Sequence, residues 1–195
     1  MAAGRPRTFC KNEALDRALQ VFWRKGFEGA SICDLTEAMG ISPPSLYAAF
    51  GNKEQLFRQA LDRYADVHSE RRKEALSAPT AREAVAAILH AAARSLTDAE
   101  SPAGCLYVQG IAGAGEHASC IRDMLNAKRA DSEREICERL KRAREEGDLP
   151  EDAEPAALAR YVATLTQGMS VQAAGGASRE DLERVVDLAM RVWPS

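Results

Sequence analysis

Between residues 31 and 53, side chains that donate hydrogen bonds stand at or near the starts of three successive predicted helices. Ser31 and Ser42 occupy N-cap positions, Tyr47 lies within the following short helix, and Lys53 begins a longer one. A helix N-terminus presents unpaired backbone N–H groups and the positive end of the helix dipole, and both attract phosphate. Hydroxyl and ammonium groups at such ends add further donors. The pattern therefore predicts a surface that fits a nucleic-acid backbone.

The charge distribution is compatible with this surface, although the whole chain of 195 residues carries a net charge of −3. Residues 1–65 hold nine Lys and Arg against seven Asp and Glu, a net +2, and the remainder holds 17 against 22, a net −5. The local field, more than the total charge, decides where an anion docks. Arg5 and Arg7 have no acidic neighbour in the first ten residues. We expect them to form an arm that enters the minor groove.

The elements that position these side chains are predicted to be helices, because alanine is abundant and apolar residues recur at intervals of three and four. We expect a first helix over residues 12–25 with Asn12 as its cap, and a second over 31–40, where Asp34 makes a near-capping box with the first residue of the segment. A third runs over 43–50 and a fourth over 52–76. Two short helices around a four-residue turn predict a helix-turn-helix.

The ordered motifs Gly26-Phe27, Gly40-Ile41-Ser42, Leu46-Tyr47-x-x-Phe50 and Lys53-Glu54-x-Leu56 resemble the TetR family of transcriptional regulators, over about residues 8–65. The resemblance implies a homodimer whose two heads dock on palindromic double-stranded operator DNA. It also implies a helical body that binds a small-molecule effector, of unknown identity, and thereby releases DNA. The positions that match phosphate contacts in the family are Ser31, Tyr47 and Lys53.

The third helix departs from the family pattern, since many members carry histidine where this chain has Ala49. It also lacks the Arg, Lys, Asn and Gln side chains that read base edges bidentately. Pro44 can touch a thymine methyl group and Ser45 can donate or accept a hydrogen bond. Weak direct readout is therefore expected. The predicted DNA-binding set is Arg5, Arg7, Ser31, Ser42, Pro43, Pro44, Ser45, Tyr47 and Lys53.

The rest of the chain predicts five further helices, over residues 80–96, 105–114, 119–146, 155–174 and 178–192. The last two are apolar around much of their circumference, which a helix on the surface of a monomer would not be. With their twofold copies they would form a four-helix dimer interface, as the family resemblance implies. The predicted interface residues are Leu158, Tyr161, Val162, Leu165, Leu182, Val185, Val186 and Ala189.

The fold class is thus all-α, with a three-helix helix-turn-helix head over residues 1–50 on a larger helical ligand-binding and dimerisation body over 51–195. Ligand pockets are usually apolar with few polar groups. The residues expected to line one, between the fourth helix and the body, are Tyr64, His68, His90, Tyr107, Gln109, Met124 and Met169.

Two alternatives stay open beside a ligand-responsive repressor. Thiolates at Cys105, Cys120 and Cys137 could bind a soft metal or sense an oxidant. An all-α enzyme or a protein-interaction module is the more distant alternative, because no nucleophile elbow, phosphate loop or zinc-protease motif occurs. We expect no cofactor and no resident metal. The absence of a secretory signal and of a long apolar run predicts a cytoplasmic protein that does not enter membranes.

Overall fold

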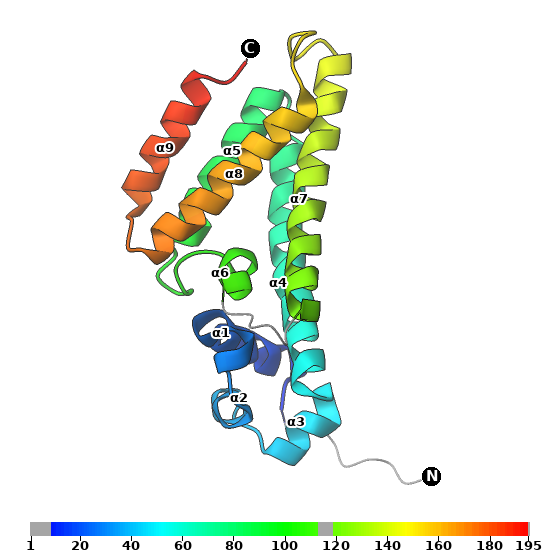
Figure 1. The fold of residues 1–195 in the computed structure, drawn as a ribbon, viewed down its shortest axis with the longest axis vertical. Coiled ribbons are helices and arrows are strands. Elements are labelled where there is room, and N and C mark those ends of the chain that lie inside the picture. The colour runs from blue at the N-terminus through cyan, green and yellow to red at the C-terminus, as the bar shows by residue number, and fades with distance from the viewer. Residues whose placement is uncertain (1–8, 113–118, 195) are drawn as a thin grey trace.

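The computed structural model describes residues 9–112 and 119–194, and all the regular elements in these ranges are helices. Three helices form a head at one end of an elongated molecule, and a long fourth helix leads from it into a layered body (Figure 1). The nine helices of the described ranges are α1 (Lys11–Gly29), α2 (Ile32–Met39), α3 (Pro43–Phe50), α4 (Lys53–Leu76), α5 (Ala81–Leu96), α6 (Leu106–Ala112), α7 (Ser119–Glu145), α8 (Pro155–Ala174) and α9 (Arg179–Arg191).

Aromatic rings fill the core of the head. Phe22 of α1 and Phe57 of α4 are buried and pack edge to face, with ring centroids 5.0 Å apart, and Phe27 lies 5.4 Å from Phe57. Burying an aromatic side chain removes a large apolar area from water, and edge-to-face geometry adds to that gain. An ion pair between Arg63 and Asp16 also joins α4 to α1. The start of α4 is therefore part of the head, while its C-terminal half belongs to the body.

The body core lies between α5, α7, α8 and α9. Its fully buried side chains include Leu89, Leu140, Val162 and Val186, one from each of these helices. α7 and α8 run beside each other over much of their length, and α9 covers the side of α5 and α8 away from α7 (Figure 1). Each helix thus buries one apolar stripe against its neighbours, as its sequence period requires.

The predicted helix boundaries are confirmed except at the first helix and, in part, the sixth. The N-cap of α1 is Cys10 and not Asn12, and the cap makes no side-chain hydrogen bond. Helical backbone continues to Gly29 beyond a kink at Gly26, whose φ of 70° and ψ of 173° interrupt the helix. Glycine adopts positive φ at little steric cost, which explains why the chain bends there. α6 is described to Ala112, and the predicted end of this helix lies outside the described residues.

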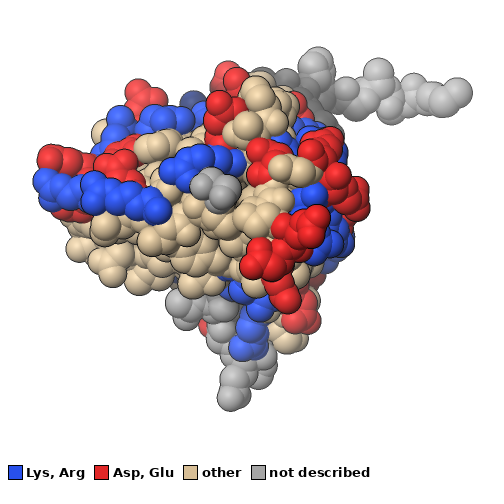
Figure 2. Space-filling model, turned by 90° about the horizontal axis from the view of Figure 1, so that it is seen from above, with Lys and Arg blue, Asp and Glu red and all other residues tan. Residues whose placement is uncertain are grey.

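The end of the body opposite the head shows interspersed Lys, Arg, Asp and Glu around an uncharged area (Figure 2). Charge pairs also occur along α7, among them Arg134 with Asp131 and Lys141 with Glu138. Such pairs at helical spacing are typical of a solvated face. No helix in the described part of the chain is long and apolar enough to span a membrane.

Candidate nucleic-acid interface and cavity

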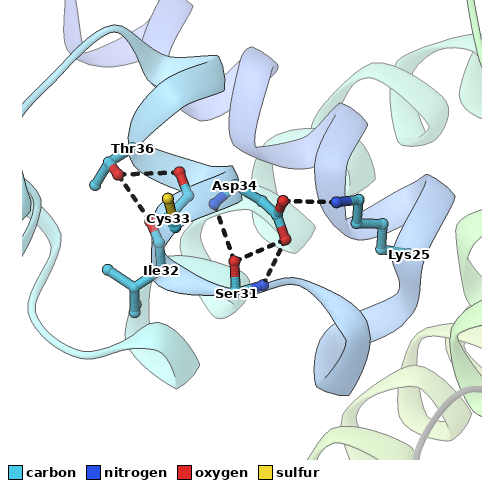
Figure 3. A network of polar contacts seen from close by, with 6 residues as sticks. All are labelled: Lys25, Ser31, Ile32, Cys33, Asp34 and Thr36. Carbon is cyan, nitrogen blue, oxygen red and sulfur yellow. Dashed lines mark hydrogen bonds and ion pairs between the residues drawn. The ribbon is translucent and has the colours of Figure 1, made fainter.

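The start of α2 is held by a reciprocal capping box between Ser31 and Asp34 (Figure 3). The backbone N–H of Asp34 donates to Ser31 Oγ over 3.0 Å, and the Ser31 hydroxyl and backbone N–H donate to Asp34 Oδ2 over 2.8 and 3.0 Å. Lys25 Nζ, near the end of α1, donates to Asp34 Oδ1 over 2.6 Å. Lys25 and then Ser31 hold the pKa of the Asp34 carboxyl well below its usual range. The carboxylate therefore stays ionised and ties α2 to α1.

This network changes how Ser31 can meet a phosphate. The Ser31 hydroxyl proton points to Asp34, so the hydroxyl is occupied within the chain. The first backbone N–H to enter the helical ladder belongs to Leu35, which leaves those of Ile32 and Cys33 without a helical carbonyl. These two N–H groups, oriented by the capping box, are the donors that α2 offers to an anion.

A tight turn fixes α3 against α2. Gly40 has a φ of 67° in the left-handed region, which suits glycine, and the N–H of Ile41 donates to the Thr36 carbonyl over 3.1 Å. The hydroxyl of the buried Thr36 donates back to the carbonyls of Ile32 and Cys33, as Figure 3 shows. With its own hydroxyl satisfied inside α2, Thr36 can be buried against the turn.

α3 exposes a surface that is almost without charge. Ser42 caps it, with Ser42 Oγ 2.9 Å from Ser45 Oγ, and both Pro43 and Pro44 are exposed. Tyr47 is 50% exposed, whereas its neighbour Leu46 is fully buried in the head core. The structure therefore brings the predicted α3 residues to one short exposed helix. The only polar side chains on this helix and its cap are two serines and one tyrosine. The expectation of weak direct readout rests on that composition.

Lys53 lies at the junction of α4 with the end of α1. Its Nζ lies 4.7 Å from the centroid of the Phe27 ring and donates to the Glu28 carbonyl over 3.3 Å. Partial burial lowers the pKa of Lys53, against the opposing charge of Glu28. An ammonium group has three donors, so two stay available for a phosphate. Arg5 and Arg7, the predicted arm, lie outside the described residues.

Lys25 is a residue of this surface that sequence reasoning missed. It is nine positions before Asp34 and lies on a different helix, so no helical spacing relates the two. Their contact depends on the bend at Gly26, which turns the chain between α1 and α2. The capping box itself was predictable, because the Ser-x-x-Asp spacing is local.

A mostly apolar cavity of about 190 Å³ lies where α4, α5, α6, α7 and α8 meet, and one residue of α1 reaches it. Of the seven predicted ligand contacts, Tyr64, His68 and Tyr107 line this cavity. Its wall also includes Trp23 of α1 and Arg129 of α7, which sequence reasoning missed. Neither residue carried a local signal, since their approach depends on how α1 and α7 pack on α4.

The structure places the other four predicted ligand contacts away from this wall. His90 pairs with Glu183 of α9, and Gln109 Nε2 donates to the Ala103 carbonyl over 2.7 Å. Met124 packs against the head core, and Met169 is buried in the body core. Helical periodicity gave these residues the correct buried or half-buried side, but it could not separate a core position from a cavity wall.

Burial controls the charge of the groups on the cavity wall. It lowers the pKa of His68 to about 4, with Arg71 and Arg72 adding to the effect, so this imidazole is neutral at pH 7. Burial also raises the pKa of Tyr64 and of Cys105, whose side chains lie 3.5 Å apart. Both side chains therefore keep their protons at neutral pH.

The three cysteines of the metal alternative do not meet. Cys105 lines the cavity, Cys120 is exposed at the start of α7, and Cys137 is half-buried about 25 Å further along the same helix. Within residues 9–112 and 119–194 no group of three metal-ligating side chains is present. The prediction of a shared soft-metal site at these cysteines is therefore wrong.

The predicted dimer face divides into two sets. Tyr161 and Val185 are each 37% exposed, and Leu158 and Leu165 are half-buried. The other four predicted residues belong to the core within one chain, because α8 and α9 turn that side towards α5: Val162, Leu182, Val186 and Ala189. Three further exposed apolar side chains of this region lie outside the predicted list: Val171, Leu188 and Val192.

Two family models match this chain. Residues 14–60 match the family model of the bacterial regulatory proteins of the tetR family, and residues 81–189 match the tetracyclin repressor-like C-terminal domain. The chain is 35% identical to the HTH-type transcriptional repressor ComR of Escherichia coli (strain K12), over 98% of this chain and 92% of that protein. It is 32% identical to the repressor BdcR of the same organism, over 92% and 86%.

Solved structures agree with these relatives. A cysteine mutant of the TetR family transcriptional regulator CifR, complexed with 26-bp double-strand operator DNA, is 46% identical to this chain and superposes with a TM-score of 0.93, over 97% of this chain and all of that one. A second CifR mutant complexed with operator DNA gives a TM-score of 0.94 at the same identity, over 98% of this chain. The predicted all-α fold with a helix-turn-helix head is confirmed.

Proposed function

Because this chain belongs to the TetR family and is a DNA-binding transcriptional regulator and not an enzyme, we propose that it is a homodimeric repressor released from a palindromic operator by a small-molecule effector. The observation that carries the proposal is the exposed, internally braced pair α2 and α3. Their N-terminal N–H groups are positioned by Ser31, Asp34 and Ser42 before any DNA arrives.

Phosphate contacts would come from the α2 N-terminus, Ser42, Ser45, Tyr47 and the remaining donors of Lys53. Such contacts fix the register of a head on the duplex. Base contacts would come from Pro43 and Pro44 against thymine methyl groups and from Arg5 and Arg7 in the minor groove. The structure of CifR complexed with operator DNA supports DNA binding by the head of this chain.

Two heads are needed, since each reads one half-site and half-sites lie about 34–36 Å apart. The exposed apolar side chains of α8 and α9 would pair with their twofold copies to hold that spacing. Tyr161 and Val171 lie on α8, Val185 and Leu188 lie on α9, and Val192 follows four positions later at the C-cap of α9. An isologous interface of this kind brings the same surface from both protomers together. A repressor of this kind would work in the cytoplasm, beside its DNA.

The effector would act from the cavity through α4. This helix begins in the head at Lys53 and ends in the body at Leu76, and its residues Tyr64 and His68 line the cavity. A ligand that fits the cavity better in one tilt of α4 than in another shifts the population of head spacings. The same molecule would then lower operator affinity.

A mobility-shift assay with the DNA upstream of this protein's own gene, at two salt concentrations, tests the proposal. We expect specific binding by a dimer whose affinity falls steeply with salt, because counterions leave the phosphates. Removing the arm with Arg5→Ala and Arg7→Ala should weaken binding, and Leu188→Glu should give monomers in sedimentation and no specific shift. Monomeric protein that binds the operator as tightly as the parent would refute the dimer.

An oxidant-sensing regulator is the second candidate, because Cys105 lies on the cavity wall beside Tyr64. Burial holds this sulfur in the thiol form, which is the less reactive form. A reactive thiolate at Cys105 would therefore require the wall to open. Operator release by peroxide that is lost in Cys105→Ser, with Cys120→Ser as the control, would favour this candidate.

A further inference from the structure

Two buried N–H donors on the wall of the cavity lack a partner. The indole Nε1 of Trp23 and the guanidinium Nε of Arg129 have no hydrogen-bond acceptor within the described ranges. Trp23 is 8% exposed, so more than nine-tenths of its surface is buried. Buried polar groups are nearly always paired, so two such donors on one cavity call for an acceptor. Among the described residues, no buried side-chain acceptor on this wall lacks a hydrogen-bond partner.

The charge of Arg129 is also uncompensated. Its terminal nitrogens donate to two neutral amides, Gln167 and Asn126, and it makes no ion pair within the part of the chain that the structure describes. Among the other charged residues of the wall, Arg72 pairs with Glu135 and Glu133 pairs with Arg160, while Arg71 makes no ion pair with the described residues. A half-buried guanidinium without an anion costs free energy that a carboxylate would recover.

The rest of the wall limits the size and polarity of the ligand. Its surface is largely apolar, although Arg71, Arg72 and Glu133 also line it. A dry cavity of about 150 Å³ is known to hold a benzene ring. At about 190 Å³ this cavity has room for one ring with a short substituent. His68 is neutral and the nearby arginines are cationic, so a cationic ligand would be disfavoured.

We propose that the cavity binds small aromatic carboxylates, with Arg129 as the anion partner and the Trp23 indole N–H as a second donor. The inference rests on the proposed function only in taking the bound acid as the effector. Trp23 belongs to α1 and packs edge-on against Tyr64 of α4, with ring centroids 5.0 Å apart. The ligand therefore touches the DNA-binding head directly, in addition to acting through α4.

Fluorescence can test this contact, because the chain has two tryptophans and Trp193→Phe leaves Trp23 as the sole source of tryptophan emission. The probes are benzoate and its neutral isostere benzamide. We expect benzoate to change Trp23 emission saturably and benzamide to bind at least tenfold more weakly. Equal affinity for both probes, or no saturable binding of benzoate, would overturn the proposal.

Variants of Arg129 and Trp23 separate the two contacts. Arg129→Gln should abolish the preference for benzoate and Arg129→Lys should keep part of it, whereas Arg134→Gln on the exposed side of α7 should behave as the parent. Trp23→Phe should weaken benzoate binding about tenfold in calorimetry, as the loss of a hydrogen bond to a charged acceptor predicts. Benzoate binding that is unchanged in Arg129→Gln, or that leaves Trp23 emission unaltered, contradicts the assignment.

Operator affinity is measured separately on the same proteins. Benzoate that binds at Arg129 without releasing the operator supports the anion site and counts against the proposed effector response. Failure to bind any operator with benzoate binding intact counts only against the proposed repressor. The two failures are thus distinguishable.

Discussion

The capping side chains at the helix ends of the head are paired with one another, whereas the wall of the cavity keeps unpaired side-chain donors. In the head, Ser31 and Asp34 satisfy each other, Asn52 and Gln55 do the same at the start of α4, and aromatic rings fill the space between. On the cavity wall, the Nε atoms of Trp23 and Arg129 have no acceptor among the described residues. A rigid head suits a fixed DNA surface, and an incompletely filled body suits a ligand that must change the equilibrium.

The largest expected effect comes from removing a ring from the head. Phe22→Ala should lower the free energy of unfolding by about 3–5 kcal/mol, since a buried phenylalanine leaves a cavity that closely packed neighbours cannot fill. Urea denaturation at a fixed protomer concentration measures the loss. Val67→Ala, on an exposed site of α4, is the control and should change stability by less than about 0.5 kcal/mol. A loss for Phe22→Ala below about 1 kcal/mol would mean that the head core is loosely packed.

Acid should weaken the body through His68, because its pKa is about 4 in the folded chain and 6.5 for an unperturbed histidine. The unfolded chain therefore binds more protons between these values, and stability falls as pH falls below 6.5. From pH 7.5 to pH 5 the loss from this residue is about 2 kcal/mol. His68→Gln should be insensitive over the same interval. The carboxyl of Asp34 titrates well below this pH interval, so it contributes little to the loss of stability there. An equal loss in His68→Gln would place the acid sensitivity elsewhere.

One substitution made in both regions sharpens the contrast in packing. Ala18→Leu in the fully packed head core should cost about 1–3 kcal/mol, because the extra atoms force neighbours apart. Ala92→Leu on the cavity wall should cost less, because the new side chain has space to enter. Only the second variant should lose benzoate binding while it still binds the operator. Equal destabilisation in the two variants would show that the cavity does not accommodate added volume.

The same contrast explains what could be predicted from the sequence. Helix existence, the capping box at Ser31 and the turn at Gly40 depend on residues within a few positions of one another, and these predictions are confirmed. The cavity wall depends on which sides of α1, α4 and α7 meet, and helical period cannot separate a wall from a core. His90 and Met169 were therefore expected there, and Trp23 and Arg129 were not.

Capping offers the smallest and most direct comparison of the two regions. Ser31 in the head and Ser178 in the body make the same reciprocal box, with Asp34 and Asp181 respectively. Replacing either serine by alanine should cost about 1 kcal/mol of stability, since one helix-end donor loses its acceptor. Urea denaturation should therefore give similar values for the two variants.

Only the head variant should also change operator affinity. In Ser31→Ala, the N–H groups that α2 offers to phosphate are no longer held in a fixed direction. We therefore expect operator affinity to fall roughly three- to tenfold, which corresponds to about one neutral hydrogen bond. Ser178→Ala should bind as the parent in the mobility-shift assay, because α9 lies in the body. Equal operator affinities in the two variants would mean that the α2 N-terminus does not contact DNA, and the phosphate contacts would then have to come from α3 and Lys53.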